Sequence, residues 1–400
     1  MNLLKAIWLA EIHRETYVAI LKSWIPHGEK GGFARRVGIS KEYLSYLCAL
    51  DRPAEGRCPG KRMPSPGLAR KIAAALPAPL EVKQSLIENM ELAHANSARA
   101  RYITREFIDQ RQGAELLSEI GQAHQLATFG TGLTEVKRAY RSVRDAAAGL
   151  IPHLSPEIYP ASLAQACLFL HDAQCVLDRA DDALRYAKLA LLVLDNSDFF
   201  EVGFDKEQVA NLEINAIRGE GVALHNLGLD REAQYSYLRA RTAPAYRNTR
   251  NFWEPLVERD LLNAMVNIPR FGFRDAQRLS REIEGICERN GDEFTLFLVR
   301  ESWLRCLIQR KKWKQAERLF HQESERFPSL PYAGSLHKAL FAKTGALLAW
   351  KLGDIATWRK RIGNALELMH HGGLNHQLRT VKQFYGENLR DIMDSLGSPR

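Results

Sequence analysis

The sequence predicts an all-α protein with a small N-terminal part and a longer helical remainder. Good helix formers such as Ala, Leu, Glu and Arg dominate after residue 80, and apolar residues recur there at spacings of three and four. Prolines and paired glycines gather at a few places, and the segments between them have the length of ordinary helices. Alternation typical of strands is nearly absent, so we expect helices packed on helices.

Composition narrows the class of protein. With 400 residues, 46% of them hydrophobic, the chain is long enough for about two or three domains and can bury real cores. No apolar run reaches the length of a membrane span, and the first residues do not form a secretory signal, so we expect a cytoplasmic protein without a membrane partner. Six scattered cysteines without a CxxC pair are typical of reduced thiols.

Positive charge is concentrated near the N-terminus. Residues 1–79 hold 6 Lys and 7 Arg against 1 Asp and 5 Glu, a surplus of +7, whereas the whole chain has a net charge of +9. A local positive field suits a polyanion such as DNA. A solvated basic surface without any partner would have the same charge, so charge alone does not separate the two interpretations.

The stretch Gly31–Leu47 predicts two short helices that cross closely. Ala34 is small where the helices would meet, and Gly38 can adopt the positive φ of a tight turn. Ser40 is a natural N-cap for the second helix, and Leu44 lies on the face of that helix that would pack inward. Beyond a loop, a Pro-Ser-Pro segment predicts the start of a further helix.

This pattern resembles the lambda-repressor/Cro-like (XRE-type) helix-turn-helix domain over residues 12–79. The resemblance implies DNA binding, with the second helix of the motif in the major groove. The candidate contact residues are Arg35, Arg36, Ser40, Lys41, Glu42, Tyr43, Ser45 and Tyr46. Either tyrosine could equally be a core residue.

Residues 51–62 depart from the family as a basic insertion before the next helix. The insertion either contacts phosphate groups or forms a solvated loop, and the sequence does not choose between these. Its basic residues are Arg52, Arg57, Lys61 and Arg62.

A second pattern occupies Asn215–Pro244. Gly221 precedes a Leu-Gly turn, and Ala233, Tyr237 and Ala240 follow at helical spacing. The small residues would let two helices approach, while the tyrosine would fill the neighbouring hole.

This pattern resembles the tetratricopeptide repeat, and weaker copies occur along the chain. Ala183, Ala233, Ala276 and Ala316 stand at equivalent positions, with spacings of 50, 43 and 40 residues against about 34 in the family. We therefore expect a helix-turn-helix domain at 1–79, a linker helix at 80–111, and an α-solenoid of tetratricopeptide-like helix pairs at 112–400. Helical hairpins that do not repeat are the alternative.

Stacked helix pairs of this family form a superhelix whose concave face holds peptides or protein segments. Amide side chains can clamp a peptide backbone, and cationic side chains can hold a carboxylate. The first-helix residues expected to line that face are Gln165, Asp172, Asn215, Arg218, Asn226, Glu301, Arg305 and Lys343.

The layout as a whole is similar to that of the RRNPP-type peptide-sensing regulators of quorum sensing, which include the phage arbitrium receptors. The resemblance implies a homodimeric transcription regulator that binds double-stranded DNA under the control of a short peptide. The alternative is a helical scaffold or adaptor that recruits a protein partner and has no regulatory DNA binding.

No motif supports an enzyme, a cofactor or a metal site. Gly56–Arg62 has one residue too few between its glycines for a phosphate loop, and it lacks the Ser or Thr that binds magnesium. His370, His371 and His376 have no Cys or acidic partner at ligand spacing. We therefore expect neither catalysis nor a bound cofactor.

Overall fold

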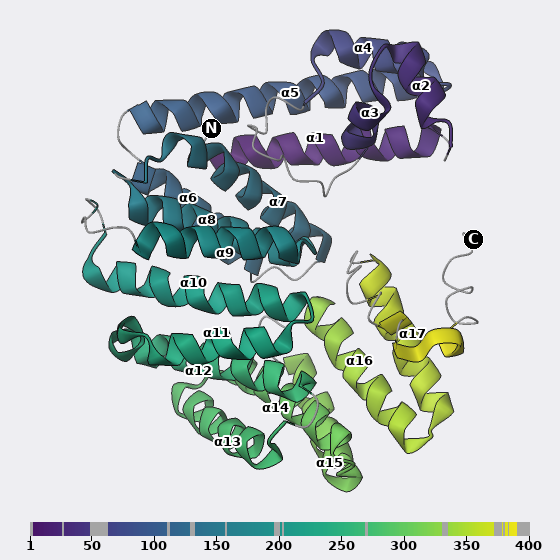
Figure 1. Ribbon diagram of the computed structural model, residues 1–400. Coiled ribbons are helices and arrows are strands. Elements are labelled where there is room, and N and C mark those ends of the chain that lie inside the picture. The colour runs from purple at the N-terminus through teal and green to yellow at the C-terminus, as the bar shows by residue number, and fades with distance from the viewer. Residues whose placement is uncertain are drawn as a thin grey trace. The chain divides into compact units, whose positions relative to one another are not determined.

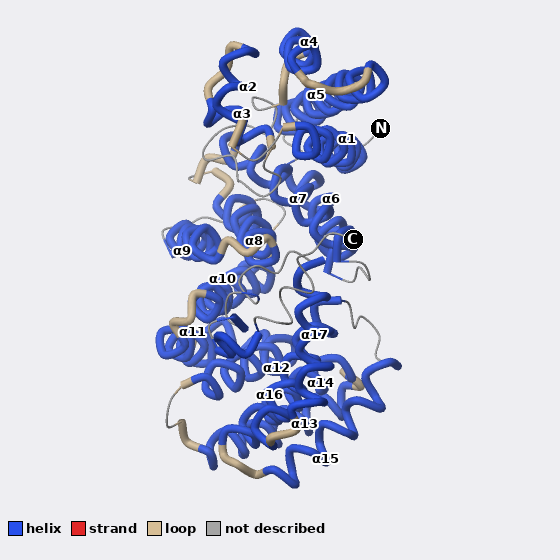
Figure 2. The backbone as a smooth tube through the Cα atoms, turned by 90° about the vertical axis from the view of Figure 1, so that its right-hand side faces the viewer, coloured by secondary structure: helices blue, strands red, loops and turns tan. Residues whose placement is uncertain are grey.

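The computed structural model is helical throughout the part of the chain that it describes (Figure 1, Figure 2). The described residues are 3–25, 28–48, 63–109, 113–128, 133–156, 158–195, 201, 204–268, 271–329, 335–371, 378, 381–382 and 384–389. Within these ranges there is no strand, which confirms the all-α prediction. None of the helices found there is both long and apolar enough to cross a membrane.

The chain divides into two compact units. Unit 1 comprises Met1–Thr128, Lys137–Leu177 and Val193–Gly203. Unit 2 comprises Phe129–Val136, Asp178–Leu192 and Phe204–Arg400.

Five helices of unit 1 share one apolar core. They are α1 (Leu3–Trp24), α2 (Lys30–Val37), α3 (Lys41–Leu47), α4 (Pro66–Ala75) and α5 (Leu80–Asp109). Leu21, Phe33, Leu44, Ile72 and Leu86 contribute one buried side chain from each helix. The α5 segment, expected to link two domains, is thus one continuous helix that packs beside α1 and also contacts α4 (Figure 1).

The remaining helices of unit 1 are α6 (Gly113–Thr128), most of α7 (Leu133–Leu150), the short η2 (Ile151–His153) and α8 (Pro160–Val176).

A buried group of charges joins α1 to α7. Arg138 donates to Glu15 at 2.7 Å, and Arg141 donates to Glu11 at 3.1 Å and also to Glu15. Arg14, one turn along α1, donates to Glu11 at 3.0 Å. Asp145 on α7 adds a third carboxylate, 4.0 Å from Arg14 and 2.8 Å from Arg144. Buried charges are costly unless they are paired, and the carboxylates of this group supply partners to its arginines.

Unit 2 is built of successive antiparallel helix pairs. Its elements are most of α9 (Ala180–Asp195), then α10 (Lys206–Asn226), α11 (Asp230–Thr242), α12 (Pro244–Asn267), α13 (Phe273–Asn290), α14 (Glu293–Gln309), α15 (Trp313–Arg326), η3 (Phe327–Ser329), α16 (Ser335–Leu352), α17 (Ile355–His371) and η4 (Gly386–Leu389). Each of α10, α12, α14 and α16 contacts the helix that follows it, and each of the first three also contacts the next of these four along the chain. We call these four the first helices and α11, α13, α15 and α17 the second helices.

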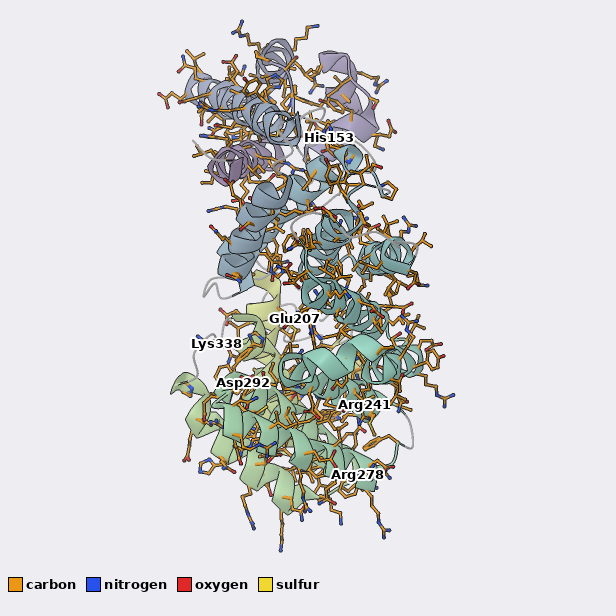
Figure 3. All side chains as sticks on the ribbon, turned by 90° about the vertical axis from the view of Figure 1, so that its left-hand side faces the viewer. His153, Glu207, Arg241, Arg278, Asp292 and Lys338 are labelled. Atoms are coloured by element: carbon orange, nitrogen blue, oxygen red, sulfur yellow. The ribbon has the colours of Figure 1, made fainter. Side chains whose placement is uncertain are left out.

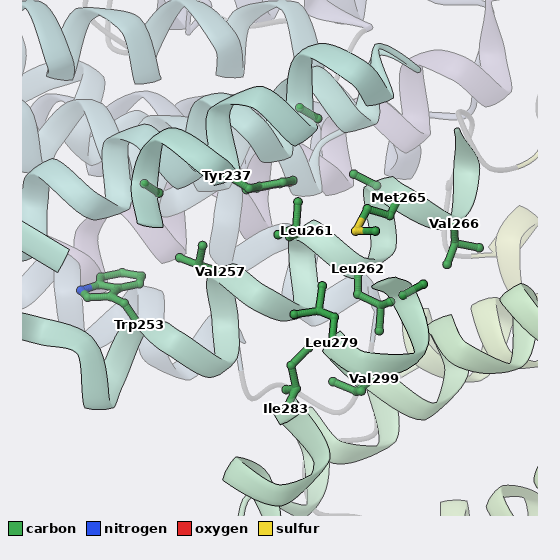
Figure 4. Close-up of a cluster of buried hydrophobic side chains, with 14 of the residues drawn as sticks. Tyr237, Trp253, Val257, Leu261, Leu262, Met265, Val266, Leu279, Ile283 and Val299 are labelled. Atoms are coloured by element: carbon green, nitrogen blue, oxygen red, sulfur yellow. The ribbon is translucent and has the colours of Figure 1, made fainter. Parts of the chain in front are cut away.

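Glycines allow the closest helix contacts of unit 2. A Cβ atom at Gly221 on α10 would lie 2.5 Å from Cε1 of Tyr237 on α11, so only glycine fits there. The close approach predicted for this pair is therefore confirmed, and Tyr237 is buried in the same core as Leu261 and Leu262 of α12 (Figure 4). A second contact of this kind, which the sequence did not predict, places Gly345 on α16 against the ring of Phe320 on α15.

Left-handed residues occur in three of the turns between consecutive helices. Asp178, Gly228 and Lys311 have φ of 63°, 80° and 56°, and each stands five residues before an alanine that is fully buried. Those alanines are 183, 233 and 316, three of the four that the repeat pattern aligned. The turn geometry therefore recurs even where the turn residue is not glycine.

Replacing Gly221 with Ala should destabilise the protein. Alanine gains up to about 1 kcal/mol of helix propensity. Overpacking against the buried ring of Tyr237 should cost about 1–3 kcal/mol, so a net loss on the order of 1 kcal/mol is expected. The measurement is the free energy of unfolding from urea titration.

Gly285→Ala on α13 is the matched control, because its Cβ would meet only the flexible end of Arg289 at 3.5 Å. This variant should gain about 0.5–1 kcal/mol. Equal stabilisation of both variants would show that the α10–α11 contact is looser than described.

Candidate functional site

The segment from α2 to α3 has the local geometry that its sequence predicts. Gly38 ends α2 with φ of 77°, which confirms the left-handed turn. The Ser40 hydroxyl accepts a hydrogen bond from the backbone N–H of Tyr43 at 3.0 Å and caps α3. Ser65 caps α4 in the same way, through the N–H of Leu68 at 3.3 Å. Each helix start is thus determined by a residue at its own end.

The polar face of α3 is open to solvent while its apolar face is buried. Leu44 and Leu47 lie in the core with Phe33, Ala34 and Val37 of α2. The exposed side chains from the predicted DNA-binding set are Arg35, Arg36, Ser40, Lys41 and Glu42.

Three further residues of that set are partly buried, namely Tyr43, Ser45 and Tyr46. The two tyrosine rings stack with centroids 6.3 Å apart and pack against the core. Burial raises the pKa of Tyr43, and the neighbouring Tyr46 adds to the rise. Both tyrosines therefore contribute to packing and still reach the surface of α3. The predicted contacts at Arg52, Arg57, Lys61 and Arg62 lie outside the described residues.

A polar network connects the first helices of unit 2, beginning between α10 and α12. Arg218 Nε donates to Oδ2 of Asp260 at 2.7 Å, and Arg259 donates to its other oxygen at 2.8 Å. Burial disfavours the charged carboxylate, but the two guanidinium groups outweigh this and hold the pKa of Asp260 below its usual value.

The network continues from α10 to α14 through an amide. Asn263 on α12 donates to Nε2 of His225 at 2.9 Å, and its oxygen accepts from Arg305 on α14. Arg305 also donates to Glu301 at 3.1 Å and to Asn267 at 3.3 Å. Most donors of this guanidinium are therefore used within the protein.

Two adjacent residues of α16, Lys343 and Thr344, lie at the end of the network. Thr344 donates to Glu301 at 2.5 Å. Lys343 is partly buried, and its removal from water lowers its pKa to about 8. The charge of Arg305 lowers this pKa further, whereas Glu301 opposes the shift. The arrangement therefore holds an ammonium group in a site that disfavours its charge.

Two arginines on the second helices are more exposed than the arginines of the network. Arg241 of α11 and Arg278 of α13, both labelled in Figure 3, are 41% and 72% exposed, whereas Arg218 and Arg305 of the first helices are 19% and 17% exposed. Ion pairs at exposed positions contribute little, because water and salt screen them. The partly desolvated charges of unit 2 named here thus lie on its first helices.

The structure gathers half of the predicted peptide-binding residues into this network, namely Arg218, Glu301, Arg305 and Lys343. The amides of Asn215 and Asn226, on α10, make no hydrogen bond within the described part of the chain. Gln165 and Asp172 belong to α8 of unit 1, where Asp172 pairs with two histidines.

Sequence reasoning missed the residues of α12 that hold the network together. Asp260, Asn263 and Asn267 are spaced by three and four residues, so they share one helix face. Asn263 stands among the apolar residues 261–266 and Asn267 directly follows them, and that interruption is the signal that could have identified the two asparagines.

Comparison with known proteins does not assign the chain to a family. No protein-family model matches it, and no curated protein sequence is significantly similar to it. In the ranges that the structure describes, no group of three or more His, Cys, Asp or Glu side chains is arranged to hold a metal ion.

Replacing Lys343 with Met should stabilise the protein in a pH-dependent way. Below pH 8 the folded state carries a partly buried charge, which the methionine variant lacks. Between about pH 8 and the pKa of an unfolded lysine, the folded wild type loses its proton before the unfolded chain does, so its stability rises with pH. The melting temperature of the variant should exceed that of the wild type at pH 7, and the difference should shrink by pH 10.

Lys314→Met on α15 is the control, since Lys314 is exposed. Its melting temperature should follow the wild type at every pH. A difference between Lys343→Met and the wild type that stays constant from pH 7 to pH 10 would contradict the low pKa of Lys343.

Proposed function

We propose that this chain is a cytoplasmic DNA-binding transcription regulator whose helix pairs bind a peptide or protein segment that changes its affinity for DNA. The observation that carries the proposal is α3: its apolar face is buried, it is capped by Ser40, and its polar face is open. A short helix held in this way can enter the major groove without losing its packing.

The chemistry of the open residues supports DNA as the partner. Arg35 and Arg36 in the last turn of α2 and Lys41 at the start of α3 would contact phosphate groups. Ser45 and the tyrosines would lie over base edges. In this proposal residues 12–79 form an XRE-type helix-turn-helix domain.

The helix pairs of unit 2 support the second half of the proposal. The contacts of each helix pair with the next support tetratricopeptide-like repeats, and in such repeats the first helices would line the ligand-binding face. The amides of Asn215 and Asn226 each offer a donor and an acceptor to a peptide backbone. We take them as the primary ligand contacts.

The network gives a physical route to regulation. The guanidinium groups of Arg218 and Arg305 already bind Asp260, Glu301 and Asn263. A ligand carboxylate would therefore have to replace an internal partner, which would change how neighbouring first helices pack. Coupling of this kind between two sites is typically worth about 1–3 kcal/mol.

Such a layout is similar to that of the RRNPP-type regulators. A homodimer fits the proposal, because one recognition helix covers few base pairs and two half-sites lie about one helical turn apart. The competing proposal, a scaffold that recruits a protein partner, predicts no DNA binding.

Replacing Arg36 and Lys41 with Ala should weaken DNA binding. Each lost phosphate contact should reduce the slope of log affinity against log salt by about 1. The measurement is a filter-binding titration of the full chain with a pool of random-sequence duplexes at several salt concentrations.

The matched control replaces two exposed cations of unit 2, Arg278 and Lys314, and removes the same net charge. It should leave both affinity and slope unchanged. Equal losses in the two double variants would indicate nonspecific electrostatics. Absence of DNA binding by the wild type would favour the scaffold.

Replacing Asn215 and Asn226 with Ala should abolish peptide capture. The immobilised full chain would be exposed to a library of random heptapeptides, and retained peptides would be identified by mass spectrometry. Asn290→Ala, an exposed asparagine on α13, is the control and should retain the same peptides as the wild type.

The retained peptides should then change the affinity of the wild type for DNA, and DNA should change peptide affinity by the same factor. Peptides that bind the double variant as tightly as the wild type would show that the ligand site lies elsewhere. Peptides that bind without any effect on DNA affinity would contradict regulation.

A further inference from the structure

Unit 1 contains a cluster of two histidines, an aspartate and a cysteine that the proposed function does not use. His171 and Cys175 are one turn apart on α8, and Nε2 of His171 lies 3.6 Å from the Cys175 sulfur. The other ring nitrogen of His171, Nδ1, lies 2.8 Å from Oδ1 of Asp172. The second oxygen of Asp172 lies 2.9 Å from Nε2 of His124 on α6, a helix that contacts α8 (Figure 1).

Burial and ring packing restrict the two histidines of the cluster. His171 is only 3% exposed, and the ring of His124 packs against Tyr140 at 5.6 Å and Phe169 at 5.5 Å. An ionised carboxylate only accepts hydrogen bonds, so Asp172 fixes Nδ1 of His171 as a donor and directs Nε2 to the sulfur. The cysteine thus faces an oriented imidazole.

The groups around His171 favour its protonated form. Burial disfavours a charged His171, but the sulfur of Cys175 and the carboxylate of Asp172 outweigh it and raise the pKa of His171 to about 10. Burial also works against the charge of Asp172, yet the two histidines hold its pKa below the usual range. His171 thus places a protonated nitrogen 3.6 Å from the sulfur, and a cation beside a cysteine is the environment in which reactive thiols are found.

Cys175 differs from the other cysteines that the structure describes. Cys48, Cys167, Cys287 and Cys306 are buried, and burial raises the pKa of each, to about 12 in the last three. Cys175 is partly exposed. Within the described residues it is therefore the thiol that combines access to solvent with an oriented base.

We propose that Cys175 is an oxidation-sensitive thiol, activated by His171, that reacts with hydroperoxides. The sulfur would attack the terminal oxygen of the hydroperoxide, forming an S–O bond as the O–O bond breaks. The sulfur is oxidised by two electrons to a sulfenic acid, and the peroxide is reduced to an alkoxide or hydroxide. That leaving group takes the proton from His171 and departs as an alcohol or water. Asp172 and His124 act as positioning residues.

The test treats the full-length chain with hydrogen peroxide at pH 7 and traps sulfenic acid with dimedone, with peptide mapping by mass spectrometry. The dimedone adduct should appear on the peptide that contains Cys175 and should be absent in Cys175→Ser. His171→Gln should slow its formation at least about tenfold, because the thiolate then lacks its cation. His153→Gln, an exposed histidine of η2, is the matched control and should react at the wild-type rate.

A second measurement does not depend on any variant folding correctly. The rate of iodoacetamide alkylation of Cys175 in the wild type at pH 7 should exceed that of a short unstructured peptide with the same flanking residues by about tenfold. The proposal is overturned if Cys175 reacts no faster than that peptide. It is also overturned if a folded His171→Gln variant, checked by circular dichroism, forms sulfenic acid at the wild-type rate.

Discussion

Close approach between helices, which small residues permit, is the constraint on which this structure depends. Gly221 admits the ring of Tyr237, Gly345 admits Phe320, and alanines with no exposed surface stand at the equivalent helix crossings. A larger side chain at these positions would separate the helices and open voids that a packed interior does not tolerate. The same close spacing brings the first helices of unit 2 near enough for side chains of moderate length to bridge them.

The second constraint is that buried polar groups need partners inside the protein. The two units provide these partners with different residues. Between α1 and α7, arginines and glutamates neutralise one another across elements more than a hundred residues apart in sequence. Among the first helices of unit 2, Asn263 links a histidine to Arg305. Removing one member of such a group leaves its partner uncompensated, so these residues are constrained by stability as well as by any ligand.

The two proposed binding surfaces therefore differ in what a ligand must displace. The exposed residues of α2 and α3 are mostly hydrated, so phosphate groups would replace water and counterions there. Arg218 and Arg305 of the first helices already have protein partners, and a ligand would exchange these partners for its own groups. This difference is consistent with a ligand-sensing role for unit 2. A ligand that replaces contacts between the first helices also changes how those helices pack.

The sequence by itself determined the all-helical class, the caps at Ser40 and Ser65, the left-handed Gly38 and the contact of Gly221 with Tyr237, because each depends on residues close in the chain or on a repeated spacing. Only the tertiary structure decided that Arg218 meets Asp260, that Arg305 meets Asn263, and that His124 lies against Asp172. These partners are about forty residues or more apart, on different helices, and helical periodicity indicates which face a side chain occupies but not which distant side chain packs opposite it.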